Sequence, residues 1–591
     1  MIMMSTKKIL SVVSFVLLTV SCQQNLLDTV PYGSIASSNM WANENLAEMG
    51  VNGIYSVLRS TDVAGDLYKF DSYGVSGDCR NQDYAILKGT ITTSDEQFSG
   101  YWKMHYEGIS RANDAISHLP SVSMSEEKKN RLLAEAKFLR AFFYYKLNMV
   151  FKGVPIYLEP IELDFVDKAR NTESEVWSQI LLDLDDVISS DVLPLKYSAD
   201  SGDYGRITKG AAYALRGKVY MWLKEWAKAE SDFLQVKSCG YDIFDDGTKD
   251  AYRHLFKESN ERSNEMIFSL QCIGVSGQGN DFSFRYGSRV TFGSCWNTFL
   301  VNTDFVDSYE NIDGSKFDWN NVIPGYNEMS PQERAVYFLR DNMTEKEINT
   351  VVANQKIDIS KYLPNGNEAR IKLAYENRDP RLQMTVITPY STYLGSIKAK
   401  EYTYTLRYPY RGYDTEEPFD LRTNTNSRFY YLFRKFVAEG ASEIPDRSYS
   451  PIDIPIIRYA DVALSMAECL NEQDRMDEAV EWVNVVRKRA RIAELNSNQY
   501  TRVIDKDDMR ERIRNERRWE FAGEGVNFFD EIRWHTWKES KFSYGAGLKQ
   551  IWGEPQYTHS WAGDYIYTWA IPRSEIQMNP NLKQNEDWPI D

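Results

Sequence analysis

The chain has 591 residues, of which 42% are hydrophobic, so it can bury a large core in one domain or several. Its formal net charge is -16 and it contains no long run of lysine and arginine. This charge argues against a nucleic-acid ligand, because phosphate binding needs a basic face, and it disfavours acidic partners in general. Aromatic residues make up 14% of the chain, and we expect most of them to pack in the interior.

The first residues predict a lipoprotein signal peptide. Two lysines precede an apolar run, Ile9 to Val20, that is too short to cross the roughly 30 Å hydrocarbon core of a membrane. The run ends in Leu-Thr-Val-Ser-Cys at 18–22, where a small residue before a cysteine is typical of a lipoprotein signal, although Thr19 replaces the usual Leu, Ile or Val.

We therefore expect residues 1–21 to be removed, Cys22 to carry a lipid, and the polar residues 22–39 to tether the protein to the membrane. Ordinary secretion with loss of Cys22 is the alternative. The expected location is the outer membrane of a Gram-negative bacterium, with the protein lipid-anchored and exposed at the cell surface.

The remaining cysteines are spread widely and include no C-x-x-C pair: Cys79, Cys239, Cys272, Cys295 and Cys469. This spacing indicates neither a disulfide framework nor a zinc site, and we expect no metal. Buried free thiols are the main interpretation, while a bridge between Cys272 and Cys295 stays open for an oxidising compartment.

The first part of the chain predicts helices separated by one long loop. Apolar residues at helical spacing predict helices near 40–58, 98–119, 132–151 and 173–189. Pro120 ends the second of these, and Thr172-Glu173-Ser174-Glu175 opens the last with a capping box. Residues 66–93 lack this period and contain several glycines, so we expect a loop there.

Residues 206–233 predict a helical hairpin of the tetratricopeptide type. Gly217, Tyr220, Ala229 and Phe233 have the spacing at which small residues let two helices approach while aromatic rings fill the space beside them. A second copy of this pattern occupies residues 463–483. Because such repeats bury their faces only against neighbours, we expect the two hairpins and the earlier helices to share one core.

The helical period fades between the two hairpins. Residues 266–270 resemble a short strand, a helix is expected near 331–341, and the stretch as a whole is irregular and rich in tyrosine. After it, residues 505–521 form a charged helix whose Glu and Arg residues are typical of a solvated or salt-bridged face. The apolar segment 569–572 is expected to pack back on the body.

Several motifs follow one another along the chain, at 133–141 with 153–155, 205–229, 458–462 with 467–471, 515–524, and 571–576 with 579–580. Together they resemble the SusD/RagB family of outer-membrane nutrient-binding lipoproteins. The resemblance implies a mainly α fold: a scaffold of about four tetratricopeptide-like helix pairs with an irregular, loop-rich half that binds the ligand. It also implies a SusC-like TonB-dependent transporter as partner, a glycan ligand, no cofactor and no catalysis.

On this basis we expect a single SusD-like domain over residues 40–591. Its helical repeats would lie mainly in 40–240 and 455–540, with an irregular ligand-binding insertion at 241–454. A peptide-binding, RagB-like member of the same family and a tetratricopeptide protein-interaction scaffold are the alternatives.

Catalytic motifs are absent from the sequence. It contains no G-x-S-x-G, H-E-x-x-H or P-loop pattern, and its five histidines are scattered. Some pair among 85 acidic residues will always lie about 5–9 Å apart, so a glycosidase remains a minor alternative.

Candidate glycan-binding residues come from stretches that leave the helical period. Flat aromatic faces stack on sugar rings while Asp, Asn and Arg bond hydroxyl groups, whereas peptide capture favours apolar pockets and strand edges. The first loop offers Tyr73, Asp78, Arg80, Asn81 and Tyr84; a later segment offers Phe284, Tyr286, Arg289 and Trp296; Trp319 follows in the insertion.

Trp296 is the strongest single candidate, because after Gly293-Ser294-Cys295 its indole has no helix face to fill. The alternative for Trp296 is that it caps the hydrophobic core beneath the loop.

Overall fold

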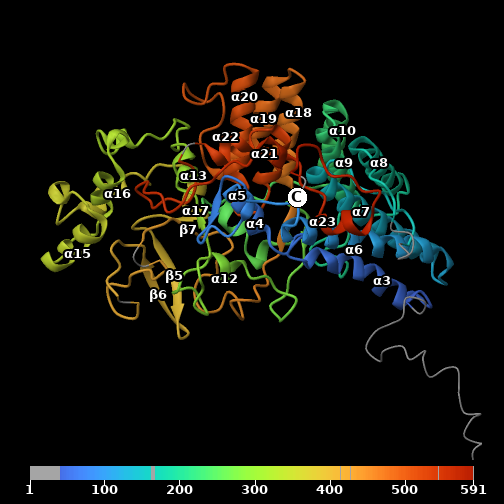
Figure 1. Cartoon of the computed structure of the whole chain (residues 1–591), viewed down its shortest axis with the longest axis horizontal. Coiled ribbons are helices and arrows are strands. Elements are labelled where there is room, and N and C mark those ends of the chain that lie inside the picture. The colour runs from blue at the N-terminus through green and yellow to red at the C-terminus, as the bar shows by residue number, and fades with distance from the viewer. Residues whose placement is uncertain (1–39, 161–166, 413, 426–427, 544, 590–591) are drawn as a thin grey trace, which may run out of the picture.

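Helices make up most of the molecule, and the strands between them are short. This computed structural model describes residues 40–160, 167–412, 414–425, 428–543 and 545–589 (Figure 1). The mainly α fold expected from the sequence is confirmed. The predicted signal peptide, Cys22 and the tether lie outside the described residues. None of the helices in those ranges is long and apolar enough to cross a membrane.

A continuous array of helices forms the scaffold, and each helix packs on the next one (Figure 1). In order they are α3 (Glu44–Ser56), α6 (Glu96–His118), α7 (Glu126–Phe151), α8 (Glu173–Ser189), α9 (Lys209–Trp222), α10 (Trp226–Ser238), α18 (Tyr459–Glu472), α19 (Met476–Ala490) and α20 (Lys506–Glu520). Helix α8 begins with the capping box predicted at Thr172 and Glu175.

The predicted hairpin is the pair α9–α10. A Cβ added at Gly217 would lie 2.5 Å from the Phe233 ring, so glycine is what permits this close approach. Arg216, which stands where such repeats usually have Leu, pairs with Asp232 at 2.6 Å across the hairpin.

The second hairpin, α18–α19, packs directly on α10 although more than 200 residues separate them. Arg475, in the turn of the second hairpin, donates to Glu230 on α10 at 2.7 Å. Phe233 and Val483 belong to the same buried cluster, which confirms that the two hairpins share a core.

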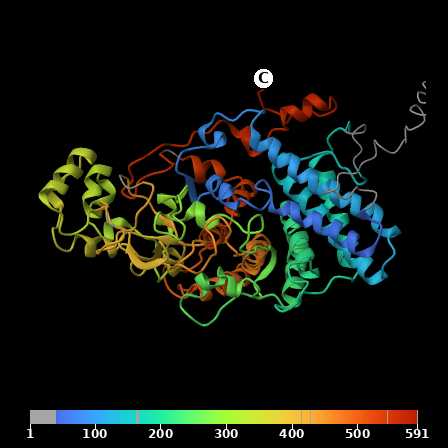
Figure 2. The ribbon, with the colours of Figure 1, turned by 90° about the horizontal axis from the view of Figure 1, so that it is seen from below.

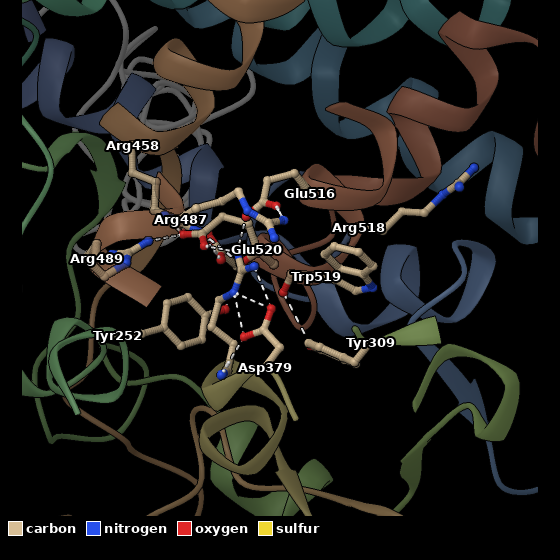
Figure 3. A network of polar contacts seen from close by, with 12 residues as sticks. Tyr252, Tyr309, Asp379, Arg458, Arg487, Arg489, Glu516, Arg518, Trp519 and Glu520 are labelled. Carbon is tan, nitrogen blue, oxygen red and sulfur yellow. Dashed lines mark hydrogen bonds and ion pairs between the residues drawn. The ribbon is translucent and has the colours of Figure 1, made fainter. Parts of the chain in front are cut away.

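A network of buried ion pairs joins the charged helix α20 to the helices beside it (Figure 3). Glu520 accepts from Arg458 at 2.7 Å and from Arg381 at 3.0 Å, and it also bonds Arg489. Glu516 pairs with Arg487 at 2.9 Å. These charges are almost fully buried, so this face of the helix is salt-bridged and not solvated.

Residues 66–93 are more ordered than the predicted loop. They form α4 (Leu67–Tyr73), β1 (Gly77–Cys79) and α5 (Ala85–Lys88). Each element is too short for its period to be read from the sequence, and the buried rings of Tyr68 and Phe70 hold the segment against the core.

Two paired strands join the beginning and the end of the irregular half, which lies between the two hairpins. The predicted strand β2 (Met266–Leu270) pairs antiparallel with β8 (Ile454–Arg458), so the segment leaves and rejoins the scaffold at one place. A hairpin of β5 (Thr392–Ile397) and β6 (Lys400–Thr405) lies within it. In Figure 2, α15 (Glu345–Gln355) and α16 (Asn367–Lys372) lie at the end of the molecule opposite the helical array.

The other elements are short. Those of the irregular half are α11 (Ala251–Leu255), α12 (Phe282–Tyr286), β3 (Phe299–Val301), α13 (Thr303–Ser308), α14 (Pro331–Ala335), α17 (Pro380–Thr385), β4 (Val386–Ile387) and β7 (Leu432–Phe433). The C-terminal part adds α21 (Asn527–Trp534), α22 (Trp537–Phe542) and α23 (Arg573–Met578). Trp569 is fully buried against Phe98 and Tyr101, as expected for a segment that packs back on the body.

The five described cysteines are buried free thiols. The main interpretation of the sequence is therefore confirmed, and no bridge joins Cys272 to Cys295 in this structure.

Candidate ligand-binding surface

Two strands bring the two candidate loops together. Strands β1 and β3 pair antiparallel, with Cys79 opposite Phe299, and the Arg80 amide donates to the Thr298 carbonyl at 2.8 Å. Arg80 and Trp296 therefore lie side by side although 216 positions separate them in the chain. The second segment begins with α12, which lies in the lower central part of Figure 1.

Trp296 presents its ring to solvent. Its side chain is 42% exposed, whereas Cys295 before it and Asn297 after it are buried. The Trp296 amide donates to the Phe284 carbonyl at 3.1 Å, and the two rings lie 4.9 Å apart at 50°. Phe284 thus supports the indole from one side and leaves the rest of it open.

Three side chains bond the backbone at and before Trp296, and a fourth bonds one of the three. Arg80 Nη1 donates to the Trp296 carbonyl at 2.7 Å, and Asn424 Nδ2 donates to the same oxygen at 2.9 Å. Arg289 Nε in turn bonds Asn424 Oδ1. Arg447 Nη1 donates to the carbonyls of Gly293 and Ser294 at 2.8 and 2.6 Å.

Arg447 also lies over the Phe284 ring, 4.6 Å from its centroid. We call the group formed by Arg80, Asn81, Phe284, Arg289, Trp296, Asn424 and Arg447 the Trp296 surface. Asn81 is exposed beside Arg80. The surface combines an open aromatic plane with several hydrogen-bond donors, which is the chemistry that a polar, flat-faced ligand requires.

Two residues proposed from the first loop lie in the interior. The Tyr73 side chain is fully buried and its hydroxyl donates to Gln97 Oε1 at 2.6 Å. Asp78 is also buried, where it pairs with Lys541 at 3.0 Å and with His559 at 2.8 Å. Both side chains are occupied by core contacts, so a ligand at the surface does not reach them.

Tyr286 and Trp319 are core residues as well. Tyr286 is fully buried and stacks on Phe433 with centroids 4.1 Å apart. Trp319 is 6% exposed, and its indole nitrogen donates to Asp307 Oδ2 at 3.0 Å. Tyr84 is half-buried, with its ring edge-to-face on Tyr73. Of the proposed residues, the structure therefore places Arg80, Asn81, Phe284, Arg289 and Trp296 together at the surface.

Asn424 and Arg447 were missed by the sequence reasoning. Both come from the tyrosine-rich stretch that was described only as irregular, and Asn424 is 128 positions from the residue it contacts. No local pattern marks either residue, because their role arises from long-range contacts.

An open hollow of about 710 Å³ lies elsewhere, between the irregular half and the scaffold. Three of the four arginines that line it have carboxylate partners: Arg253 and Arg434 pair with Glu439, and Arg491 pairs with Asp245 at 2.6 Å. The fourth, Arg378, is buried and donates to backbone carbonyls. The hollow therefore offers fewer free donors than the Trp296 surface does.

Comparisons with known proteins match most of the chain. Residues 264–588 match the family model described as the SusD family, and residues 25–221 match one described as "Starch-binding associating with outer membrane". The SusD-like protein P25 of Formosa agariphila is 23% identical, and the alignment covers 98% of each chain.

Solved structures share this fold, and two of them show the similarity. A SusD-like protein from Bacteroides fragilis has a TM-score of 0.73 at 22% identity, over 95% of this chain and 100% of the other. A structure described as a laminarin-binding SusD-like protein has a TM-score of 0.61 at 22% identity, over 93% of this chain and 100% of the other.

Proposed function

The chain belongs to the SusD family, and we propose that it captures glycans at the outer membrane and delivers them to a SusC-like TonB-dependent transporter. One observation carries the glycan part of this proposal. Trp296 presents an open indole whose backbone is fixed by Arg80 and Asn424, so a sugar ring can stack on it without the loop having to order itself first.

Three other lines support the proposal. A related structure is described as laminarin-binding, and a family model that matches the first part of the chain is described as starch-binding and associated with the outer membrane. The signal sequence ending at Cys22 fits a lipid anchor. We propose binding without catalysis.

The Trp296→Ala variant tests the binding site. Loss of one stacking ring costs about 1–3 kcal/mol for planar ligands, so we expect affinity for the cognate polysaccharide to fall about 5- to 150-fold. Affinity electrophoresis through gels that contain laminarin, starch or other polysaccharides measures this change. The melting temperature should hardly move, because the ring is open to solvent.

Trp482→Ala, a half-buried tryptophan on α19, is the matched control and should leave affinity unchanged. If Trp296→Ala lowers the melting temperature by several degrees with affinity intact, Trp296 caps the core and the site lies elsewhere. Release of reducing sugars on incubation with the bound glycan would contradict the proposal of binding without catalysis.

Two further experiments test location and partner. Cys22→Ala should move the protein from the membrane fraction to the soluble fraction, and retention in the membrane would contradict lipid anchoring at Cys22. Purification of the wild type in mild detergent should recover a transporter of about 100 kDa or more, the size expected of a large barrel with its plug. Recovery of this chain alone, with ligand present, would count against the delivery step.

A further inference from the structure

We propose that the Trp296 surface selects glycans that carry carboxylate or sulfate groups. This inference rests on the proposed function and adds the chemical class of the ligand. The net charge of -16 predicts that acidic partners are disfavoured, and an acidic glycan is contrary to that prediction. The local charge on this surface has the opposite sign to the charge of the whole chain.

Arg80, Arg289 and Arg447 lack acidic partners. Within the described part of the chain, none of the three forms an ion pair with a carboxylate, and their hydrogen bonds go to backbone carbonyls and to Asn424. Carboxylates do lie nearby, since Asp414 pairs with Arg422 at 2.8 Å and Asp446 is close to Cys295. The three arginines nevertheless keep their charges uncompensated.

These arginines also repel one another. Partial burial and the neighbouring Arg422, Arg447 and Arg80 together lower the pKa of Arg289. Such a set of like charges stores electrostatic free energy, which an anion bound among them would release.

Each guanidinium retains free donors. A guanidinium has five N–H groups, and Arg80 and Arg447 each use only Nη1 in hydrogen bonds among the described residues, while Arg289 uses Nε. The remaining N–H groups can form the paired bonds that planar carboxylates and sulfate oxygens accept.

The charges also lie close to the exposed ring. Arg80 donates to the backbone carbonyl of Trp296, and Arg447 lies over Phe284, whose ring contacts the indole. A sugar ring that stacks on Trp296 would therefore place a charged substituent within reach of at least one guanidinium. A neutral glycan would use the aromatic plane and leave the charges unpaired.

The test compares charged polysaccharides with their neutralised forms. Affinity gels contain polygalacturonate, alginate or chondroitin sulfate, each beside its carboxyl-reduced derivative, and chondroitin sulfate also beside its desulfated derivative; laminarin and starch serve as neutral polymers. We expect retardation by at least one anionic polymer and at least tenfold weaker retardation by its neutralised form. The derivative that loses binding distinguishes carboxylate from sulfate recognition.

Arg289→Gln and Arg447→Gln should each weaken binding of that polymer about tenfold, which is the effect of losing one charge-assisted contact. Arg502→Gln, at an exposed arginine on the loop before α20, is the matched control and should have no effect. If Arg447→Gln disturbs the loop, seen as a lower melting temperature, Arg289→Gln carries the test, because Arg289 bonds only a side chain with its guanidinium. Binding of the anionic polymer should also weaken as NaCl is raised.

Two results would overturn the inference. One leaves the proposed glycan-binding function standing, and the other contradicts it as well. If only neutral polymers bind, with dependence on Trp296 and not on the arginines, the glycan-binding function stands and charge selection is wrong. If no polymer of either kind binds, both proposals fail.

Discussion

Arginine has opposite surroundings in two regions of this molecule. In the interior, Arg381, Arg458 and Arg489 converge on Glu520 and are almost completely shielded from solvent (Figure 3). On the Trp296 surface, Arg80 and Arg447 bond neutral carbonyls. A buried guanidinium needs partners that offset its lost hydration, and around Glu520 those partners are carboxylates, whereas a guanidinium at the surface can keep its charge for a ligand.

The buried arginines stabilise the fold, whereas the exposed arginines are available to bind a ligand. Motifs that carry the family resemblance, at 458–462 and 515–524, supply the interior network and join α18 to α20. Residues of the Trp296 surface lie outside those motifs. The scaffold can therefore remain fixed while the chemistry of the ligand site changes.

The largest expected effect is at the centre of the interior network. Glu520→Gln removes the charge that offsets three buried guanidinium groups, and breaking such a pair costs about 3–5 kcal/mol. Unfolding in urea or guanidinium chloride at pH 7 measures this loss in the free energy of unfolding. A loss below about 1 kcal/mol would mean that the network does not depend on this charge.

Trp319→Phe tests a buried tryptophan, for comparison with the exposed Trp296. The substitution removes the indole donor of Asp307, which is a buried carboxylate whose pKa burial raises to about 6. A buried acceptor left without its partner costs about 1–3 kcal/mol, and we expect a lower melting temperature. Ligand affinity should stay at the wild-type value, the reverse of the result expected for Trp296→Ala.

Acid should reduce the difference between wild type and Glu520→Gln. Burial alone would raise the pKa of Glu520, but Arg489, Arg458 and Arg381 outweigh it and hold the pKa well below its usual range. The stability that this ionised group contributes is present above its unfolded pKa of about 4.3 and is lost as the pH falls toward the folded value. Denaturation curves from pH 7 to pH 3 should show the two proteins converging, by at most about 1.4 kcal/mol per pH unit below pH 4.3.

The smallest effect on stability belongs to the surface cluster. Arg289→Gln should change the free energy of unfolding by no more than about 0.5 kcal/mol, because the side chain is partly exposed and glutamine keeps a donor for Asn424. A loss of several kcal/mol in the same unfolding assay would show that the surface arginines are structural, like those of the interior.

The sequence predicted those features that depend on neighbours along the chain. The hairpin at 206–233 and the capping box at Thr172 were identifiable because helical spacing and caps are local patterns. The interior network was only half predicted: the charge pattern of α20 suggested ion pairs, but the residues that complete them come from distant segments.

The candidate site was harder to predict for the same reason. An aromatic residue in a loop can face the core or the solvent, and composition does not decide between the two. Tyr286 and Trp319 turned inward, whereas Trp296 remained open, as its place after Gly293-Ser294-Cys295 suggested. Arg447 could not be identified at all, since nothing near it in the sequence shows that it crosses to residues 293 and 294.

The pairing of β1 with β3 has a consequence for the order of folding. Trp296 gains its support from Arg80 only after the chain has closed a loop of 216 positions, whereas the helices from α6 to α10 each pack on the next helix along the chain. Contacts that are distant in sequence form slowly, so we expect these helices to assemble first. The Trp296 surface should follow, as should the packing of α18 on α10, which also joins distant parts of the chain. A newly made chain should therefore acquire its capacity to bind late in its maturation.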